Sequence, residues 1–209
     1  MNNLAFFITC SLIASISHAI VSDFCVGDIN LPMGPSGYAC KNPSNVTLDD
    51  FIFTGFRVGG PTNNGFKNNV HLAFADAYPG LNGLGISIAR LDLAVGGSIP
   101  MHTHRSSEVI ILVKGTIIAG FIDNDNVAYY KTLEVGDVMI FPQGLLHFQV
   151  NVGKGPALAF VSLNSANPGL QVTSTALFAG NLPAEIVEKT TLIDHSQVLK
   201  LRKMFGNSS

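Results

Sequence analysis

The feature that most constrains the fold is a series of short β-type segments separated by turn residues between positions 84 and 163. Val, Ile, Thr and aromatic residues are frequent in the segments, and Gly, Pro, Asn and Asp interrupt them. We expect strands at 84–93, 108–113, 116–122, 127–133, 138–141, 145–150 and 157–163. Short strands at this spacing predict an all-β sandwich or barrel rather than a parallel α/β sheet.

Two segments of different character flank the expected barrel, which we place at residues 49–180. Residues 20–48 are rich in Gly, Pro and Asn, which predicts an irregular N-terminal arm, and the Asn-rich segment 61–69 predicts a further loop. Residues 181–209 predict a C-terminal helical extension with helices at 182–189 and 194–205. Asp194 is placed to cap the second helix, which carries Val198, Leu201 and Phe205 on one face. A neighbouring subunit is a reasonable surface for these helices to pack on.

The composition favours a self-associating protein without a nucleic-acid partner. The 209 residues fit one domain, and only 12% of them are charged, compared with about 25% in a typical soluble domain. This shortage of charge indicates apolar surface buried between subunits. The net charge is −2, and no Lys/Arg cluster is long enough to follow a nucleic-acid backbone.

The first 19 residues resemble a secretory signal peptide. They contain a short apolar run that ends in the small-x-small sequence Ser17-His18-Ala19, although no Lys or Arg precedes the run. A membrane anchor and a buried first strand are the alternatives, but the run is shorter than the roughly 20 apolar residues that span a bilayer. We therefore expect a secreted chain without a membrane span.

Secretion gives a context for the cysteines and for one glycosylation sequon. Cys10 would leave with the leader, so Cys25 and Cys40 would remain with one way to pair in an oxidising compartment. Two free buried thiols are the alternative. Asn45 begins the sequon Asn-Val-Thr and is the expected glycosylation site, whereas a second sequon at Asn207 lies at the chain terminus.

Three histidines and one glutamate form a pattern typical of a metal site. In a strand, residues two apart face the same side, so His102 and His104 can point into one cavity, and Glu108 has the same parity. His147 lies on a later expected strand that a barrel can bring alongside. These residues stand in two glycine-flanked boxes: Gly96-x5-His102-x-His104-x3-Glu108-x6-Gly115 and Gly136-x5-Pro142-x-Gly144-x2-His147-x3-Asn151.

The ligand set favours a redox metal with free coordination positions. Three neutral nitrogens and one carboxylate leave one or two positions open on a six-coordinate ion, which suits Mn or Fe. Cu and Zn also bind such sites tightly, so the ligand types alone do not select the metal. His71 and His195 have no comparable context, and we expect them to be ordinary loop or surface residues.

The two boxes resemble the cupin motifs of the germin and germin-like proteins of plants. The similarity runs from Asp23 to the end of the chain and is greatest to the branch that includes auxin-binding members. Further matching stretches are Asp23-Phe-Cys25-Val, Gly37-Tyr-Ala-Cys40, Leu84-Gly-Ile-Ser-Ile-Ala-Arg-Leu-Asp92, Phe141-Pro-Gln-Gly-Leu-Leu-His-Phe-Gln-Val-Asn151 and Pro168-Gly-Leu-Gln171.

The resemblance implies a cupin jelly-roll β-barrel that binds Mn through His102, His104, Glu108 and His147. It also implies a Cys25–Cys40 disulfide and an extracellular glycoprotein of the apoplast and cell wall. The expected assembly is a hexamer, a trimer of dimers, with the C-terminal helices in the subunit contacts.

Two departures from the family pattern bear on activity. The oxalate oxidases of this family hold their substrate with two asparagines, and the matching positions here are Ala89 and Ile99. Neither side chain can donate a hydrogen bond to a carboxylate, so we do not expect oxalate oxidase activity. A basic-Gly-acidic tripeptide often precedes the second box, but here it reads Val135-Gly136-Asp137, which removes support for an adhesion role.

Three functions are compatible with this pattern. The first is Mn superoxide dismutase activity in the cell wall, with a role in defence or development. The second is binding of a small aromatic acid such as auxin through its carboxylate, with Ile99, Met101 and Phe148 as candidates for an apolar wall. The third is a structural wall glycoprotein whose metal rigidifies the barrel.

Overall fold

The structure is a computed structural model that describes residues 22–206. The expected signal peptide at 1–19, Cys10 and the sequon at Asn207 lie outside the described residues.

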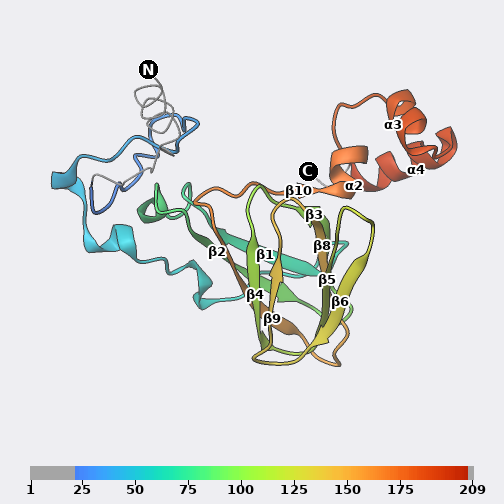
Figure 1. Ribbon diagram of the computed structural model, residues 1–209, viewed down its shortest axis with the longest axis horizontal. Helices are drawn as coiled ribbons and strands as arrows, with labels where there is room; N and C mark the ends of the chain where they lie inside the picture. Colours follow the sequence, from blue (N-terminus) through green and yellow to red (C-terminus); the bar gives the residue numbers. More distant parts are fainter. Residues whose placement is uncertain (1–21, 207–209) are drawn as a thin grey trace, which may run out of the picture.

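Two antiparallel five-stranded sheets face each other and form a jelly-roll barrel (Figure 1). One sheet has the order β1-β2-β9-β4-β7 and the other the order β10-β3-β8-β5-β6. The expected all-β fold is therefore confirmed. The strands are β1 Asn68–Ala73, β2 Ser87–Leu93, β3 Ser98–Thr103, β4 Glu108–Lys114, β5 Ile117–Ile122, β6 Ala128–Leu133, β7 Val138–Phe141, β8 Leu146–Asn151, β9 Ala157–Leu163 and β10 Gln171–Val172.

Alternation of side chains along the strands produces the core between the sheets. In β2 every second residue from Ser87 to Leu93 is buried, and β9 repeats this pattern from Ala157 to Leu163. These inward residues join Ile110, Leu112 and Phe141 in one apolar cluster. Burying a Leu, Ile or Phe side chain contributes about 1.5–3 kcal/mol, which makes this cluster the main source of stability.

Most expected strands are present with ends shifted by a few residues, but the first strand was not predicted. The segment 61–69 was expected to be a loop, whereas β1 begins at Asn68. The first two residues of β1 are asparagines, which are rare in strands. Its outer face is covered by Phe53 and Phe56, whose rings lie 5.9 and 5.8 Å from His71 on β1. This aromatic cover supports pairing that the strand's own sequence does not signal.

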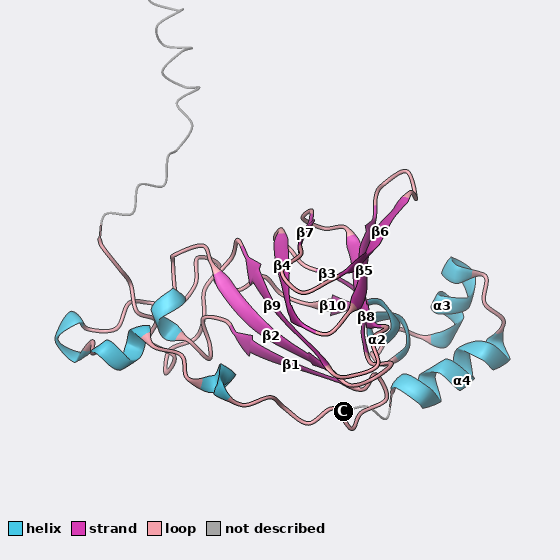
Figure 2. Cartoon of the chain, turned by 90° about the horizontal axis from the view of Figure 1, so that it is seen from below, coloured by secondary structure: helices cyan, strands magenta, loops and turns pink. Residues whose placement is uncertain are grey.

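The N-terminal arm is tied together by the predicted disulfide and by one buried amide. Cys25 and Cys40 form a disulfide, which confirms their pairing. Asn82 accepts a hydrogen bond from the backbone N–H of Tyr38 (2.9 Å) and donates to the carbonyls of Cys25 (3.1 Å) and Tyr38 (2.9 Å). The arm lies to one side of the barrel (Figures 1 and 2). The short 3₁₀ turns that precede β2, in the arm and after it, are η1 Pro43–Asn45, η2 Leu48–Phe51, η3 Gly55–Arg57 and η4 Pro79–Leu81.

Three helices project from the side of the barrel opposite to the arm (Figures 1 and 2). They are α2 Thr173–Phe178, which was not predicted, α3 Ala184–Thr191 and α4 His195–Phe205. Asp194 caps α4 as expected, because its Oδ1 accepts a hydrogen bond from the N–H of Gln197 at 3.1 Å. The helices enclose a small core of their own, formed by Phe178, Val187 and Val198. Within residues 22–206, no helix is long and apolar enough to cross a membrane.

Candidate metal centre

His102, His104, Glu108 and His147 converge inside the barrel, with one potential ligand atom of each within 4.8 Å of every other. We expected these groups to come from two strands, but three strands and a loop supply them. His102 lies on β3 opposite His147 on β8, His104 lies in the β3–β4 connection, and Glu108 begins β4. Because β4 belongs to one sheet and β3 and β8 to the other, the site joins both sheets.

Backbone carbonyls fix the orientation of the three imidazole rings. The Nδ1 atoms of His102 and His147 lie 2.8 and 2.9 Å from the carbonyl oxygens of Pro100 and Leu145. The Nδ1 atom of His104 is hydrogen-bonded to the carbonyl of Gly169. A carbonyl oxygen only accepts, so each Nδ1 carries the proton. Each Nε2 is then left with a free lone pair, which is the usual arrangement of metal-binding histidines.

The inward atoms of this cluster are all acceptors. The Nε2 atoms of His104 and His147 lie 3.2 and 3.6 Å from Oε2 of Glu108. The buried Nε2 of His147 has no hydrogen-bond partner. Lone pairs facing a carboxylate in a buried site are costly unless a positive charge lies between them. The donor set therefore fits a bound metal cation.

The protonation states of these groups suit a metal ligand set. Burial, followed by the proximity of His147, lowers the pKa of His102 to about 4, which leaves its ring neutral at pH 7. Burial alone would raise the pKa of Glu108, but the close approach of the His104 and His147 rings lowers it to about 2. The site thus offers a neutral imidazole beside an ionised carboxylate.

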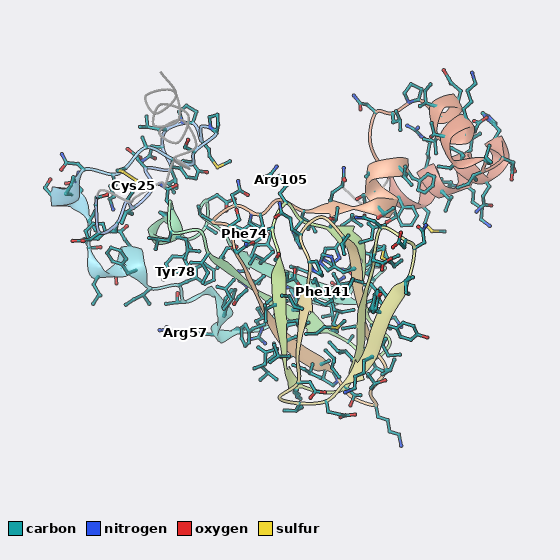
Figure 3. All side chains as sticks on the ribbon, viewed as in Figure 1. Cys25, Arg57, Phe74, Tyr78, Arg105 and Phe141 are labelled. Atoms are coloured by element: carbon teal, nitrogen blue, oxygen red, sulfur yellow. A yellow bond between two sulfur atoms is a disulfide. The ribbon has the colours of Figure 1, made fainter. Side chains whose placement is uncertain are left out.

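Phe141 supports the ligand His147 from the core. The two rings are stacked, with centroids 4.7 Å apart and an interplanar angle of 17°. Figure 3 shows Phe141 inside the barrel, between the sheets. Phe141 is fully buried, so this contact restricts the rotation of the His147 ring.

Asn151, the last residue of the second box, has a structural role. Its side-chain amide donates to the carbonyls of Leu93 (3.2 Å), Ala94 (2.9 Å) and Gly155 (2.9 Å). Its carbonyl oxygen accepts from the N–H of Gly153 at 2.9 Å. These bonds fasten the end of β8 to the end of β2, away from the metal ligands.

A small cavity of about 30 Å³ adjoins the ligand cluster. Ala89 and Ile99 both line this cavity. They are the residues that the sequence pattern matches to the substrate-holding asparagines of the oxalate oxidases. Apart from the ligands, the only polar side chain in its lining within the described residues is Gln149. The lining residues are Val70, Leu72, Phe74, Ala89, Leu91, Ile99, His102, His104, Glu108, Gln149, Val161, Leu163 and Leu170.

Gln149 is the functional candidate that the sequence interpretation missed. It is fully buried, and neither its amide nitrogen nor its amide oxygen has a hydrogen-bond partner. The available signal was its spacing, because Gln149 lies two residues after His147 and therefore on the same face of β8.

The other residues considered from the sequence lie elsewhere. Met101 and Phe148 do not line the cavity, because each neighbours an inward-facing histidine on its strand and faces the other side. His71 packs in the aromatic cluster over β1. His195 is an exposed partner of Glu188 on the helical extension.

Comparisons with known proteins place the chain in a family. The family model described as Cupin matches residues 55–199. Germin-like protein subfamily 3 member 3 of Arabidopsis thaliana is 56% identical over 204 residues, which cover 97% of each chain. The chain belongs to the germin-like proteins of the cupin family. The auxin-binding protein ABP19a of Prunus persica is another similar member, 54% identical over 97% of this chain and 98% of its own length.

A solved oxalate oxidase has the same fold as this germin-like protein. The two structures superpose with a TM-score of 0.86 at 32% sequence identity, over 90% of this chain and 98% of the oxalate oxidase. Enzymatic activity is therefore found in the family on the same barrel. The activity of an individual member depends on the residues around its own site.

Proposed function

We propose that this germin-like protein is a secreted manganese protein of the plant cell wall that dismutates superoxide. The observation that carries the proposal is the convergence of three lone-pair-bearing Nε2 atoms and one carboxylate beside a small apolar cavity. Such a site suits a small oxygen species better than a larger substrate with several polar groups.

In this proposal His102, His104, Glu108 and His147 hold the ion. Manganese bound there would supply the one-electron exchange in which two superoxide ions and two protons give dioxygen and hydrogen peroxide. The carboxylate of Glu108 offsets part of the metal's charge, and the carbonyls bonded to Nδ1 hold the orientation of the rings. The unpartnered amide of Gln149 can donate a hydrogen bond to an anion in the cavity.

The residues at the cavity disfavour oxalate oxidation. Oxalate carries two carboxylates, and each needs hydrogen-bond donors when it leaves water. Ala89 and Ile99 are 2% and 6% exposed and present only apolar surface to the cavity. The fold shared with an oxalate oxidase is therefore not an argument for oxalate as the substrate of this chain.

A second candidate function is binding of an auxin-type aromatic acid. Its support is the name and the similarity of the auxin-binding protein ABP19a of Prunus persica. In that version the carboxylate would reach the metal from the cavity. The small volume of the cavity makes this the weaker candidate. A purely structural wall glycoprotein is the third.

The assembly and location belong to the same proposal. Outward-facing apolar side chains on β4 and β7 are exposed, among them Val109, Ile111, Val138 and Ile140. An exposed apolar patch of this kind is typical of subunit contacts, which supports the proposed hexamer, a trimer of dimers. Asn45 is exposed at the end of η1, where a glycan can be attached.

Peroxide production from superoxide by the purified, manganese-loaded chain tests the dismutase. We expect wild-type protein to accelerate it and the His102→Ala variant to lose both metal and activity. The His195→Ala variant is the control, because it removes an exposed histidine outside the site. A metal-free His102→Ala protein with the wild-type rate would disprove the proposal.

A further inference from the structure

Leu170 lies at the mouth of the metal-side cavity. It is 47% exposed, whereas every other lining residue within 22–206 is buried or half-buried. Its side chain therefore belongs both to the cavity wall and to the protein surface. A ligand that enters beside Leu170 would pass its side chain on the way to the metal ligands.

The backbone on both sides of Leu170 is fastened to the segment that carries two of the ligands. The carbonyl of Pro168 accepts from the N–H of Arg105 at 2.9 Å, and the carbonyl of Gly169 is bonded to Nδ1 of His104. Beyond Leu170, β10 pairs with β3 opposite Thr103 and His102. Gly169 has a φ of +67°, a conformation that favours glycine and sets the turn before Leu170. The backbone at Leu170 is thus held next to the segment that carries the ligands. Its partly exposed side chain can be replaced without breaking these backbone hydrogen bonds.

The cavity behind Leu170 is suited only to very small ligands. One water needs about 10–15 Å³ of such space, so the 30 Å³ present corresponds to about two or three heavy atoms. An aromatic acid has several times that number. Apart from Gln149 and the ligands, the wall has no polar side chain within the described residues that would compensate for a second charged group.

We propose that Leu170 is the size-selecting gate of the metal site, which admits anions of about two or three heavy atoms and hinders longer ones. The gate rests on the proposed metal site but not on dismutase activity. The ligand class that follows is small anions with a single oxygen-based polar group. Such an anion would bind the metal and accept a hydrogen bond from the amide of Gln149.

A homologous series of carboxylates measures the gate. Formate, acetate, propionate and butyrate are titrated into the manganese-loaded full chain, and binding is followed by the change in the electron paramagnetic resonance spectrum of the ion. In a tight pocket each extra methylene is worth about tenfold or more. We expect wild-type affinity to fall at least about tenfold from formate to butyrate, and Leu170→Ala to abolish most of that fall.

Three further variants keep the experiment decisive. Leu170→Met preserves the side-chain volume and should retain the wild-type cut-off, and Leu170→Phe should weaken the binding of formate as well. Leu31→Ala removes a leucine of matching exposure, 48%, from the arm and should behave as wild type. Equal affinity of the wild type for formate and butyrate would overturn the gate. So would an unchanged fall in a folded, metal-loaded Leu170→Ala protein.

The gate and the dismutase fail in different ways. Size selection without superoxide turnover would refute the proposed activity and leave the gate intact. Superoxide turnover without size selection would refute the gate alone.

Discussion

His147 on β8 and Glu108 on β4 meet between the two sheets, with Nε2 of His147 3.6 Å from Oε2 of Glu108. The contact brings together groups from strands that are not hydrogen-bonded to each other. Folding of both sheets is therefore required before the four-residue cluster exists. A metal bound there would stabilise only the folded chain, by an amount that grows with its free concentration.

Restoring amides at the cavity should improve oxalate binding. In the Ala89→Asn/Ile99→Asn double variant, each new hydrogen bond to a carboxylate is worth about 1.5–3 kcal/mol. We expect oxalate to perturb the spectrum of bound manganese at a concentration at least about tenfold lower than in wild type. An Ala89→Val/Ile99→Leu variant changes the volume without adding donors, so an equal gain there would show that the amides are not the cause.

Removing the disulfide should destabilise the fold without emptying the metal site. Cys25 and Cys40 are separated by 15 positions, and opening a loop of that length costs about 3 kcal/mol in the chain-entropy model. Chemical denaturation of the Cys25→Ser/Cys40→Ser variant measures this loss. A reducing agent should produce the same loss in wild type and none in the variant. Metal content that falls in parallel would contradict the separation of arm and site.

Replacing Asn151 should destabilise the barrel through lost hydrogen bonds. Asn151→Ala leaves three carbonyls and one N–H without the side chain that now satisfies them. Orphaned buried polar groups cost about 1–3 kcal/mol each, and we expect a net loss of about 3 kcal/mol because water can reach part of this region. Asn124→Ala, at an exposed turn, should stay within about 0.5 kcal/mol of wild type. Equal unfolding midpoints for the Asn151→Ala variant and the wild type would contradict this structural role of Asn151.

The cap of α4 should weaken in acid. Hydrogen bonds from the Ser196 hydroxyl and the Gln197 N–H lower the pKa of Asp194 below its usual 3.8. A lowered pKa means that the carboxylate stabilises the fold above pH 3.8 and loses this effect as pH falls through the folded-state value. Amide hydrogen exchange in the first turn of α4, followed as a function of pH, measures this loss of stability. Asp194→Asn caps without titrating, so its protection should not follow the same pH dependence.

Much of the fold was predictable because its signals are local. The strands from β4 to β9 carry β-branched residues between turn residues, and the structure contains them with small shifts at their ends. The helix cap at Asp194 and the pairing of Cys25 with Cys40 were also confirmed. The boxes indicated the four site residues, and the structure brings their side chains together.

What the sequence did not predict depends on tertiary contacts. β1 is supported by aromatic residues of the preceding segment rather than by its own composition. In β3 the register shifts between Ile99 and His102, so both are buried although three residues apart, against the period of two. Gln149 looked like one polar residue among many until its burial and its missing partners were known.

The most direct test of the central claim is metal analysis of the native protein combined with electron paramagnetic resonance. We predict about one manganese per chain in wild type, and loss of the ion in His147→Ala because a buried ligand is removed. The His71→Ala variant, altered outside the cluster, should keep its manganese. Native protein without a transition metal, or a His147→Ala variant with the wild-type manganese content, would contradict the assignment of His102, His104, Glu108 and His147 as the metal site.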